Sequence, residues 1–183
     1  HHDMGLIGSL LGSFYIGIPL VLMSTDAFIM RPHRWLDAIS KYRATFSCAP
    51  NFAFHMATRA ADRVDPSTDL SRWRIALCGA EPIDPAVIRD FEHVFASRGL
   101  RAGVVVPVYG LAENTLAATF SKPGAGVRVD HVSRPSLEDG RRVPSPPESM
   151  ETRGVVSVGG PVYGQRVVVA AGGPNAGAVG GAN

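Results

Sequence analysis

The chain has 183 residues, of which 45% are hydrophobic and 19% charged, so it can bury a substantial core and is expected to form one domain or a little more. Its net charge is only +2, and its basic residues are scattered rather than gathered in a stripe, which argues against nucleic acid as a partner. Cys48 and Cys78 have no CxxC spacing and no histidine at metal-ligand spacing, so neither a zinc site nor a disulfide framework is expected. Two reduced core thiols favour a cytoplasmic protein.

The first predicted element lies in an apolar segment, Met4–Thr25, that contains no charged side chain. Glycines, serines and Pro19 interrupt its run of large apolar side chains. Its length approaches that of a membrane span, which is the alternative interpretation. Because no basic region precedes the segment and the interruptions are frequent, no stable membrane span is expected. We predict a buried, glycine-rich helix over Leu6–Ile16, a turn at Gly17–Pro19 and a buried strand over Leu20–Met23.

Helices and strands are predicted to alternate after this segment. Pro32 suits the first turn of a helix, in which Trp35, Ile39 and Tyr42 share one face. The elements that follow are a strand at Thr45–Ala49, a helix at Phe52–Val64, a strand at Arg74–Cys78, a helix at Asp84–Ser97 and a strand at Val104–Val108. Continuous apolar strands separated by helices indicate an α/β fold with a mostly parallel sheet and helices on both faces.

Two of the predicted strands end in loops that carry chemical groups. In open α/β sheets, ligands gather beyond the carboxyl ends of the strands. The first loop is Gly79–Pro82, in which Gly79 allows a flat ligand to approach the backbone. The second is Tyr109–Thr115, in which Tyr109 can stack on an aromatic base and Glu113 can bind Mg²⁺. Each feature alone is typical of an ordinary turn, but together they indicate a purine nucleotide site.

The order of four motifs adds a family resemblance to this interpretation. The chain contains, in sequence, HHDMGLIG, PNFAF, CGAEPI and YGLAENTLA. Over residues 1–169 it resembles the adenylate-forming superfamily of acyl-CoA synthetases and AMP-binding enzymes, and most closely the fatty acyl-AMP ligases. The long connection over Ser121–Gly154 favours the acyl-AMP ligase branch, with a fatty acyl-CoA synthetase as the alternative. The resemblance implies an internal fragment of the large N-terminal domain of such an enzyme.

The resemblance implies an ATP-dependent ligase reaction. A fatty acid carboxylate attacks the α-phosphorus of ATP, giving acyl-AMP and pyrophosphate, with Mg²⁺ stabilising the phosphoryl charge. The acyl acceptor that it implies is an acyl carrier protein or a polyketide synthase. The sequence contains no lysine-ended phosphate loop, ribose-binding aspartate or C-terminal lysine domain of this family, so the chain is expected to be inactive alone. A non-catalytic remnant or binding module is the rival class.

The resemblance also assigns roles to individual residues. His2 would lie near the carboxylate and the α-phosphate as a catalytic residue, and Glu113 would be catalytic through Mg²⁺. Ala112 occupies a position where many members of the superfamily have threonine, so Asn114 or Thr115 is a candidate to contact the phosphate instead. The nucleotide-binding residues would be Gly79, Ala80, Glu81, Pro82, Tyr109, Gly110, Leu111 and Ala112. The acyl pocket would comprise His2, Met4, Gly5, Ile7 and Phe54, whose ordinary core packing is the alternative.

The two initial histidines have three possible origins. A purification tag and a metal site are the alternatives to the family motif. His1 and His2 lead directly into Met4–Gly5 and the next predicted helix, as the family motif does, and no further metal ligand is nearby. A hydrolase is not expected, because the chain contains no GxSxG motif.

The part of the chain after residue 120 is predicted to be irregular. Ser121–Arg153 is rich in proline, arginine and serine and is expected to be a surface loop, followed by strands at Val155–Val158 and Arg166–Ala170. The predicted organisation is an incomplete α/β nucleotide- and acyl-binding subdomain over 1–120, an insertion-like loop over 121–154, the start of a β-rich subdomain over 155–170 and a disordered Gly/Ala tail over 171–183.

Overall fold

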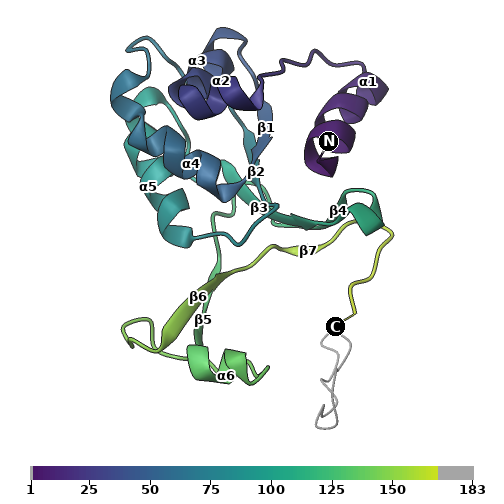
Figure 1. Cartoon of the computed structure of the whole chain (residues 1–183), viewed down its shortest axis with the longest axis vertical. Coiled ribbons are helices and arrows are strands. Elements are labelled where there is room, and N and C mark those ends of the chain that lie inside the picture. The colour runs from purple at the N-terminus through teal and green to yellow at the C-terminus, as the bar shows by residue number, and fades with distance from the viewer. Residues whose placement is uncertain (1, 169–183) are drawn as a thin grey trace.

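A five-stranded mixed sheet runs through the computed structural model, which describes residues 2–168 (Figure 1). The strand order is β1-β2-β3-β4-β7. The parallel strands are β1 (Phe46–Ala49), β2 (Ile75–Cys78) and β3 (Val105–Gly110), and the antiparallel strands are β4 (Ala117–Phe120) and β7 (Gly160–Pro161). The expected α/β class is confirmed, with two antiparallel strands that the sequence did not reveal.

Two crossover helices connect the parallel strands. Helix α4 (Asn51–Arg59) joins β1 to β2, and α5 (Pro85–Phe95) joins β2 to β3. Pro85 occupies the first turn of α5, and the side chain of Asp84 accepts a hydrogen bond from Ala86 N at 2.8 Å, which caps the helix. Both helices lie on one side of the parallel strands, and the N-terminal helix lies on the other (Figure 1). Each predicted helix and strand in this part of the chain is confirmed to within a few residues.

An aromatic cluster forms the centre of the core between these helices and the sheet. Phe91 of α5 contacts Phe54 of α4 edge to face, with ring centroids 5.1 Å apart, and Trp35 contacts both Phe54 and Trp73 at 5.3 Å. Phe54, Trp73, Phe91 and Phe95 are fully buried. Edge-to-face pairs of this kind add about 0.5–1.5 kcal/mol each to the area that they bury. The cluster therefore fixes α4 and α5 against β1–β3.

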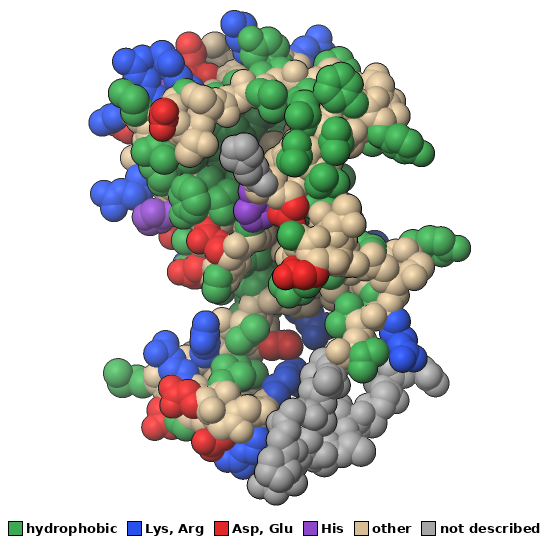
Figure 2. All heavy atoms as spheres, turned by 45° about the vertical axis from the view of Figure 1, so that its right-hand side comes forward, with side chains coloured by type: hydrophobic (Ala, Val, Ile, Leu, Met, Phe, Trp, Pro, Cys, Tyr) green, Lys and Arg blue, Asp and Glu red, His purple; other side chains and the backbone are tan. Residues whose placement is uncertain are grey.

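The N-terminal segment differs from its prediction in burial. The predicted helix is present, as a π-helix over Met4–Leu11 that continues into α1 (Gly12–Ile16) and ends at Gly17, whose φ of 74° is left-handed. None of its residues is buried, so the predicted burial is wrong. The strand predicted at Leu20–Met23 is also wrong, because these residues pair with no strand and remain exposed. Figure 2 shows hydrophobic side chains exposed on this face.

Further differences concern short elements. Helix α3 (His33–Lys41) follows Pro32 as predicted, but α2 (Thr25–Met30), β4 and β7 were not predicted. The region expected to be a loop contains a two-stranded antiparallel hairpin, β5 (Val129–Ser133) and β6 (Thr152–Val156), with α6 (Arg134–Glu138) between the strands. No helix in residues 2–168 is long and apolar enough to cross a membrane.

The C-terminal predictions have mixed outcomes. The strand predicted at Val155–Val158 overlaps the end of β6. Residues 166–168 of the strand predicted at Arg166–Ala170 belong to no strand, and its last two residues lie outside the described part. The tail predicted at 171–183 also lies outside the described residues, and the division into subdomains stays a prediction.

Replacing Phe91 by alanine is expected to lower the free energy of unfolding by about 3–5 kcal/mol, because it leaves a cavity at the centre of the aromatic cluster. Phe14→Ala is the matched control, since 76% of Phe14 is exposed, and it should change stability by less than about 0.5 kcal/mol. Urea unfolding followed by tryptophan fluorescence measures both. Similar stabilities of the two variants would contradict the central role of the cluster.

Candidate functional site

Two adjoining cavities open at the carboxyl ends of β2 and β3. The first, of about 60 Å³, lies between the N-terminal helix and the sheet, and its walls are largely apolar. The second, of about 410 Å³, lies between the Gly79–Ile83 loop, the end of β3 and strand β6. The residues common to both cavities are Ala80, Val108, Tyr109 and Gly110. The predicted convergence of the two strand-end loops is therefore present, and these loops separate a small apolar space from a wider one that Glu81 and Arg153 also line.

The loop after β2 passes very close to β3. A Cβ atom at Gly79 would lie 2.8 Å from the carbonyl oxygen of Val108 and 2.9 Å from its Cγ2 atom, so only glycine fits here without displacement of β3. Ala80 follows with φ of 67°, a left-handed conformation that costs free energy for a residue with a Cβ atom. Strain of this kind is typical of backbone held in place for a function.

A hydrogen bond ties this loop to the start of α4. Glu81 Oε1 accepts a hydrogen bond from Phe52 N at 2.6 Å, and Gly79 N donates to the carbonyl of Ala49 at 3.4 Å. The amide of Phe52 belongs to the first turn of α4, where N–H groups have no partner within the helix and the helix dipole favours a negative charge. Glu81 thus connects two of the sequence motifs, and its carboxylate contacts the protein itself.

The loop after β3 begins with a bend at Gly110, where only glycine fits. The register between β3 and β4 shifts at Tyr109 and Gly110, and a Cβ atom at Gly110 would collide with the carbonyl oxygen of Leu116. The adjacent Tyr109 is 51% exposed and lines both cavities, so its ring is available to a ligand. Asn114 Nδ2 donates to the carbonyl of Ala117 at 2.8 Å, which closes the loop.

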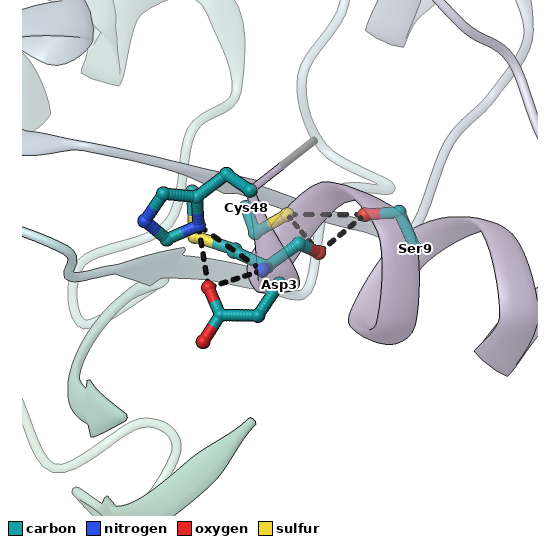
Figure 3. Close-up of polar contacts among 5 residues, drawn as sticks. Asp3, Ser9 and Cys48 are labelled. Carbon is teal, nitrogen blue, oxygen red and sulfur yellow. Dashed lines mark hydrogen bonds and ion pairs between the residues drawn. The ribbon is translucent and has the colours of Figure 1, made fainter. Parts of the chain in front are cut away.

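A polar cluster lies where the start of the N-terminal helix borders the first cavity (Figure 3). His2 Nδ1 is 2.6 Å from Asp3 Oδ1, and both residues line the cavity. The hydroxyl of Ser9 lies 3.2 Å from Cys48 Sγ, which also faces the cavity. Burial raises the pKa of the Cys48 thiol, and the hydrogen bond with Ser9 lowers it by less. Cys48 is therefore a protonated thiol at neutral pH rather than an activated nucleophile.

The structure brings together only part of the predicted site. The predicted residues that line the cavities are His2, Met4, Ala80, Glu81, Pro82, Tyr109 and Gly110. Those that line neither cavity are Gly5, Ile7, Gly79, Leu111, Ala112 and Glu113, although Gly79, Leu111, Ala112 and Glu113 lie within the two loops. Phe54 lies in the aromatic core with no exposed surface, because α4 turns it toward Trp35 and Phe91. The roles assigned to all these residues stay predictions.

Several residues that line the cavities were not predicted as site residues. Phe46, Leu77, Leu116 and Phe120 supply apolar walls of the first cavity, and Arg153 of β6 supplies the basic side chain of the second. Residues of β6 alternate between half-buried and exposed, but TRGVV has no apolar–polar alternation, and nothing in the sequence shows that this strand lies beside the Gly79–Ile83 loop.

The fold and the paired cavities define an α/β protein with a candidate ligand site at the carboxyl ends of its parallel strands. The profile of one family, described as AMP-binding enzyme, matches residues 1–175. The chain belongs to this AMP-binding enzyme family, as its motifs predicted.

Characterised relatives support the expected branch. The chain is 42% identical over 171 residues to the medium-chain-fatty-acid–[acyl-carrier-protein] ligase JamA of Moorena producens, an alignment that covers 92% of this chain and 29% of that protein. It is 43% identical over 148 residues to the long-chain-fatty-acid–AMP ligase FadD32 of Mycobacterium marinum, covering 78% of this chain and 23% of that protein. The chain thus spans less than a third of the length of these relatives.

A solved structure gives the same result. The fatty acid AMP ligase from Legionella pneumophila superposes with a TM-score of 0.79 at 36% identity, covering 88% of this chain and 28% of that one. A fatty acyl-adenylate ligase from the same organism, solved in complex with acyl adenylate and pyrophosphate, has the same TM-score and identity. The resemblance to fatty acyl-AMP ligases is therefore confirmed in sequence and in fold.

Replacing Gly110 by alanine is expected to destabilise the chain by about 1–3 kcal/mol, because the new methyl group forces the β3–β4 bend apart at Leu116. Gly160→Ala is the control, since a Cβ atom there meets nothing within 4 Å and should change stability by less than about 0.5 kcal/mol. Thermal unfolding measures the difference. Equal melting temperatures of the two variants would show that the bend tolerates a side chain.

Removing the carboxylate of Glu81 is expected to loosen the start of α4. Glu81→Ala should cost about 1 kcal/mol of stability, as the loss of a helix N-cap does, and should accelerate amide hydrogen exchange at Phe52. Glu113→Ala is a suitable control, because the Glu113 side chain is exposed and forms no hydrogen bond or ion pair with another described residue. Unchanged exchange at Phe52 in Glu81→Ala would refute the anchoring role.

Proposed function

We propose that this chain contributes the acid-activating site of a fatty acyl-AMP ligase. The observation that carries the proposal is the shared wall of the two cavities, Ala80, Val108, Tyr109 and Gly110, which places a small apolar space directly beside a wider one that the charged side chains of Glu81 and Arg153 also line. An acyl adenylate has the same two halves, an apolar chain and a nucleotide, joined at one phosphate. The relatives, a long-chain-fatty-acid–AMP ligase and a ligase of medium-chain fatty acids and an acyl carrier protein, support this assignment.

The reaction joins the substrates at the boundary between the cavities. A carboxylate oxygen of the fatty acid attacks the α-phosphorus of ATP, a new P–O bond forms, the bond from this phosphorus to the bridging oxygen breaks, and pyrophosphate leaves. Catalysis of this kind depends on positioning and on charge stabilisation. In the proposed arrangement His2 lies beside the carboxylate, and Tyr109 stacks on the adenine. Arg153 in the wider cavity offers a cation to the phosphates.

The proposed acyl chain enters the first cavity. Its apolar walls come from Met4, Phe46, Leu77, Leu116 and Phe120, and fatty acid burial there follows from the hydrophobic effect. Its volume of about 60 Å³ accommodates only a small part of an acyl chain, so the N-terminal helix must move away from the sheet as the chain enters. No residue of that helix is buried, which is consistent with such a movement.

The proposed site also suits Mg²⁺. This ion is usually held by one or two carboxylates together with substrate phosphates, and Glu113, an exposed carboxylate in the loop after β3, provides one such ligand. When bound, the ion would neutralise charge on the phosphates. Tyr109, His2 and the loop backbone would orient the substrates.

The proposal extends to the acyl acceptor and to the cellular compartment of the protein. JamA of Moorena producens and TtuA of Teredinibacter turnerae are named as ligases of acyl carrier proteins, which favours a carrier protein or a polyketide synthase over coenzyme A as the acyl acceptor. A fatty acyl-CoA synthetase remains the second candidate on family grounds. The two free cysteines favour the cytoplasm.

Binding of a non-hydrolysable decanoyl-adenylate analogue tests the proposed function in the 183-residue chain. Isothermal titration calorimetry should detect binding, and Tyr109→Ala should weaken it roughly 5- to 150-fold, because a base-stacking contact is lost. Tyr109→Phe keeps the ring and should bind as the wild type does. Tyr42→Ala, which removes an exposed tyrosine from the end of α3, is the matched control. Absence of binding by the wild-type chain, or equal affinities for Tyr109→Ala and Tyr42→Ala, would contradict the proposal.

A further inference from the structure

The contacts around Asp3 determine which nitrogen of His2 faces a ligand. His2 Nδ1 lies 2.6 Å from Asp3 Oδ1, and the same carboxylate oxygen accepts a hydrogen bond from Met4 N at 2.8 Å (Figure 3). Met4 N is also 3.2 Å from His2 Nδ1. The imidazole Nε2 atom forms no hydrogen bond or ion pair with another residue in the described part of the chain. Only one of the two ring nitrogens is therefore engaged by the protein.

The shortest of these contacts decides the tautomer. An ionised carboxylate can only accept hydrogen bonds, so a nitrogen 2.6 Å from Asp3 Oδ1 must carry a proton. A protonated Nδ1 has no lone pair for the amide of Met4, and this amide has a shorter and better partner in Asp3 Oδ1. Asp3 is consequently the acceptor for both donors, and neutral His2 has its proton on Nδ1 and its lone pair on Nε2.

The carboxylate is held more firmly than the ring that it orients. The Asp3 side chain is 14% exposed and the His2 side chain 63% exposed. The carbonyl of His2 accepts hydrogen bonds from Gly5 N at 3.1 Å and Leu6 N at 2.9 Å, which attaches the histidine backbone to the start of the helix. The ring can therefore rotate only about its side-chain bonds, and the bond to Asp3 restricts that rotation.

We propose that Asp3 is a positioning residue that fixes His2 in the Nδ1–H form, so that Nε2 is the ring atom that meets the ligand in the first cavity. Nε2 then acts as an acceptor when the ring is neutral and as a donor when it is protonated. The identity of the ligand, a carboxylate or acyl-phosphate oxygen, rests on the proposed function. The tautomer of His2 is independent of the proposed function.

Asp3 also caps the helix, and the test must separate this role from positioning. Aspartate and serine are equally favourable N-caps. Asp3→Ser therefore keeps a cap for Met4–Leu11 but removes the carboxylate that reaches His2. Backbone chemical shifts of Gly5–Leu11 report whether the helix is retained in the variant.

The tautomer is measured by long-range ¹H–¹⁵N correlation spectra of the ¹⁵N-histidine-labelled chain, with His2 assigned through His2→Gln. At a pH of about 8.5 a free histidine side chain is neutral. The wild-type spectrum should show a protonated Nδ1 and an unprotonated Nε2, and Asp3→Ser should shift His2 toward the Nε2–H form of free histidine. An Nε2–H form in the wild type, or an unchanged tautomer in Asp3→Ser with its helix retained, would overturn the proposal.

The decanoyl-adenylate analogue then tests the contact itself. On titration into the wild-type chain, the ¹⁵N resonance of Nε2 should shift more than that of Nδ1. A larger shift at Nδ1, with Tyr109 resonances also responding, would overturn the proposed presentation of Nε2. If no resonance responds, the proposed function fails for this chain, whereas the tautomer in the ligand-free spectrum still decides the role of Asp3.

Discussion

The parallel register of β1, β2 and β3 is the constraint on which the candidate site depends. Ala49 lies opposite Cys78, and Cys78 lies opposite Pro107, so the three strands end within a few residues of one another. Their carboxyl ends consequently deliver the start of α4, the Gly79–Ile83 loop and the loop from Tyr109 to the same edge of the sheet. The aromatic cluster beneath holds the crossover helices that make this register possible. The strand register alone therefore brings these three segments, which are distant in sequence, next to one another.

Much of this arrangement could be predicted because it follows from local patterns. Short apolar runs bounded by turns are buried strands, and the helices between them require parallel pairing, so the core of the fold and the two strand-end loops were foreseeable. Glycine at 79 and 110 is explained by backbone approaches that leave no space for a Cβ atom. These are cases in which the residue type and the geometry have the same physical cause.

The incorrect predictions arise where partners are remote or missing from the sequence pattern. Leu20–Met23 is as apolar as a buried strand, but apolarity does not supply the neighbouring strand that pairing requires. Strand β7 pairs with β4 across some forty residues of chain, and it is only two residues long, so no periodicity marks it. Arg153 is concealed for the same reason, because about 70 residues of chain separate it from Ile83 in the loop that it faces. Phe54 is an apolar residue of the kind that can line an acyl pocket, but its position on α4 directs its side chain into the core.

The buried thiol of Cys78 and the half-buried thiol of Cys48 have a practical consequence for studies of this chain. Burial, together with a smaller effect of the Glu81 carboxylate, raises the pKa of Cys78 to about 12, and burial also raises the pKa of Cys48. Thiol-directed labels react with thiolates, so both native cysteines react slowly near neutral pH. A cysteine introduced at an exposed position would be modified first. Fluorophores or spin labels can therefore be attached at chosen sites without prior removal of either native cysteine, and distances across the site can be followed in solution.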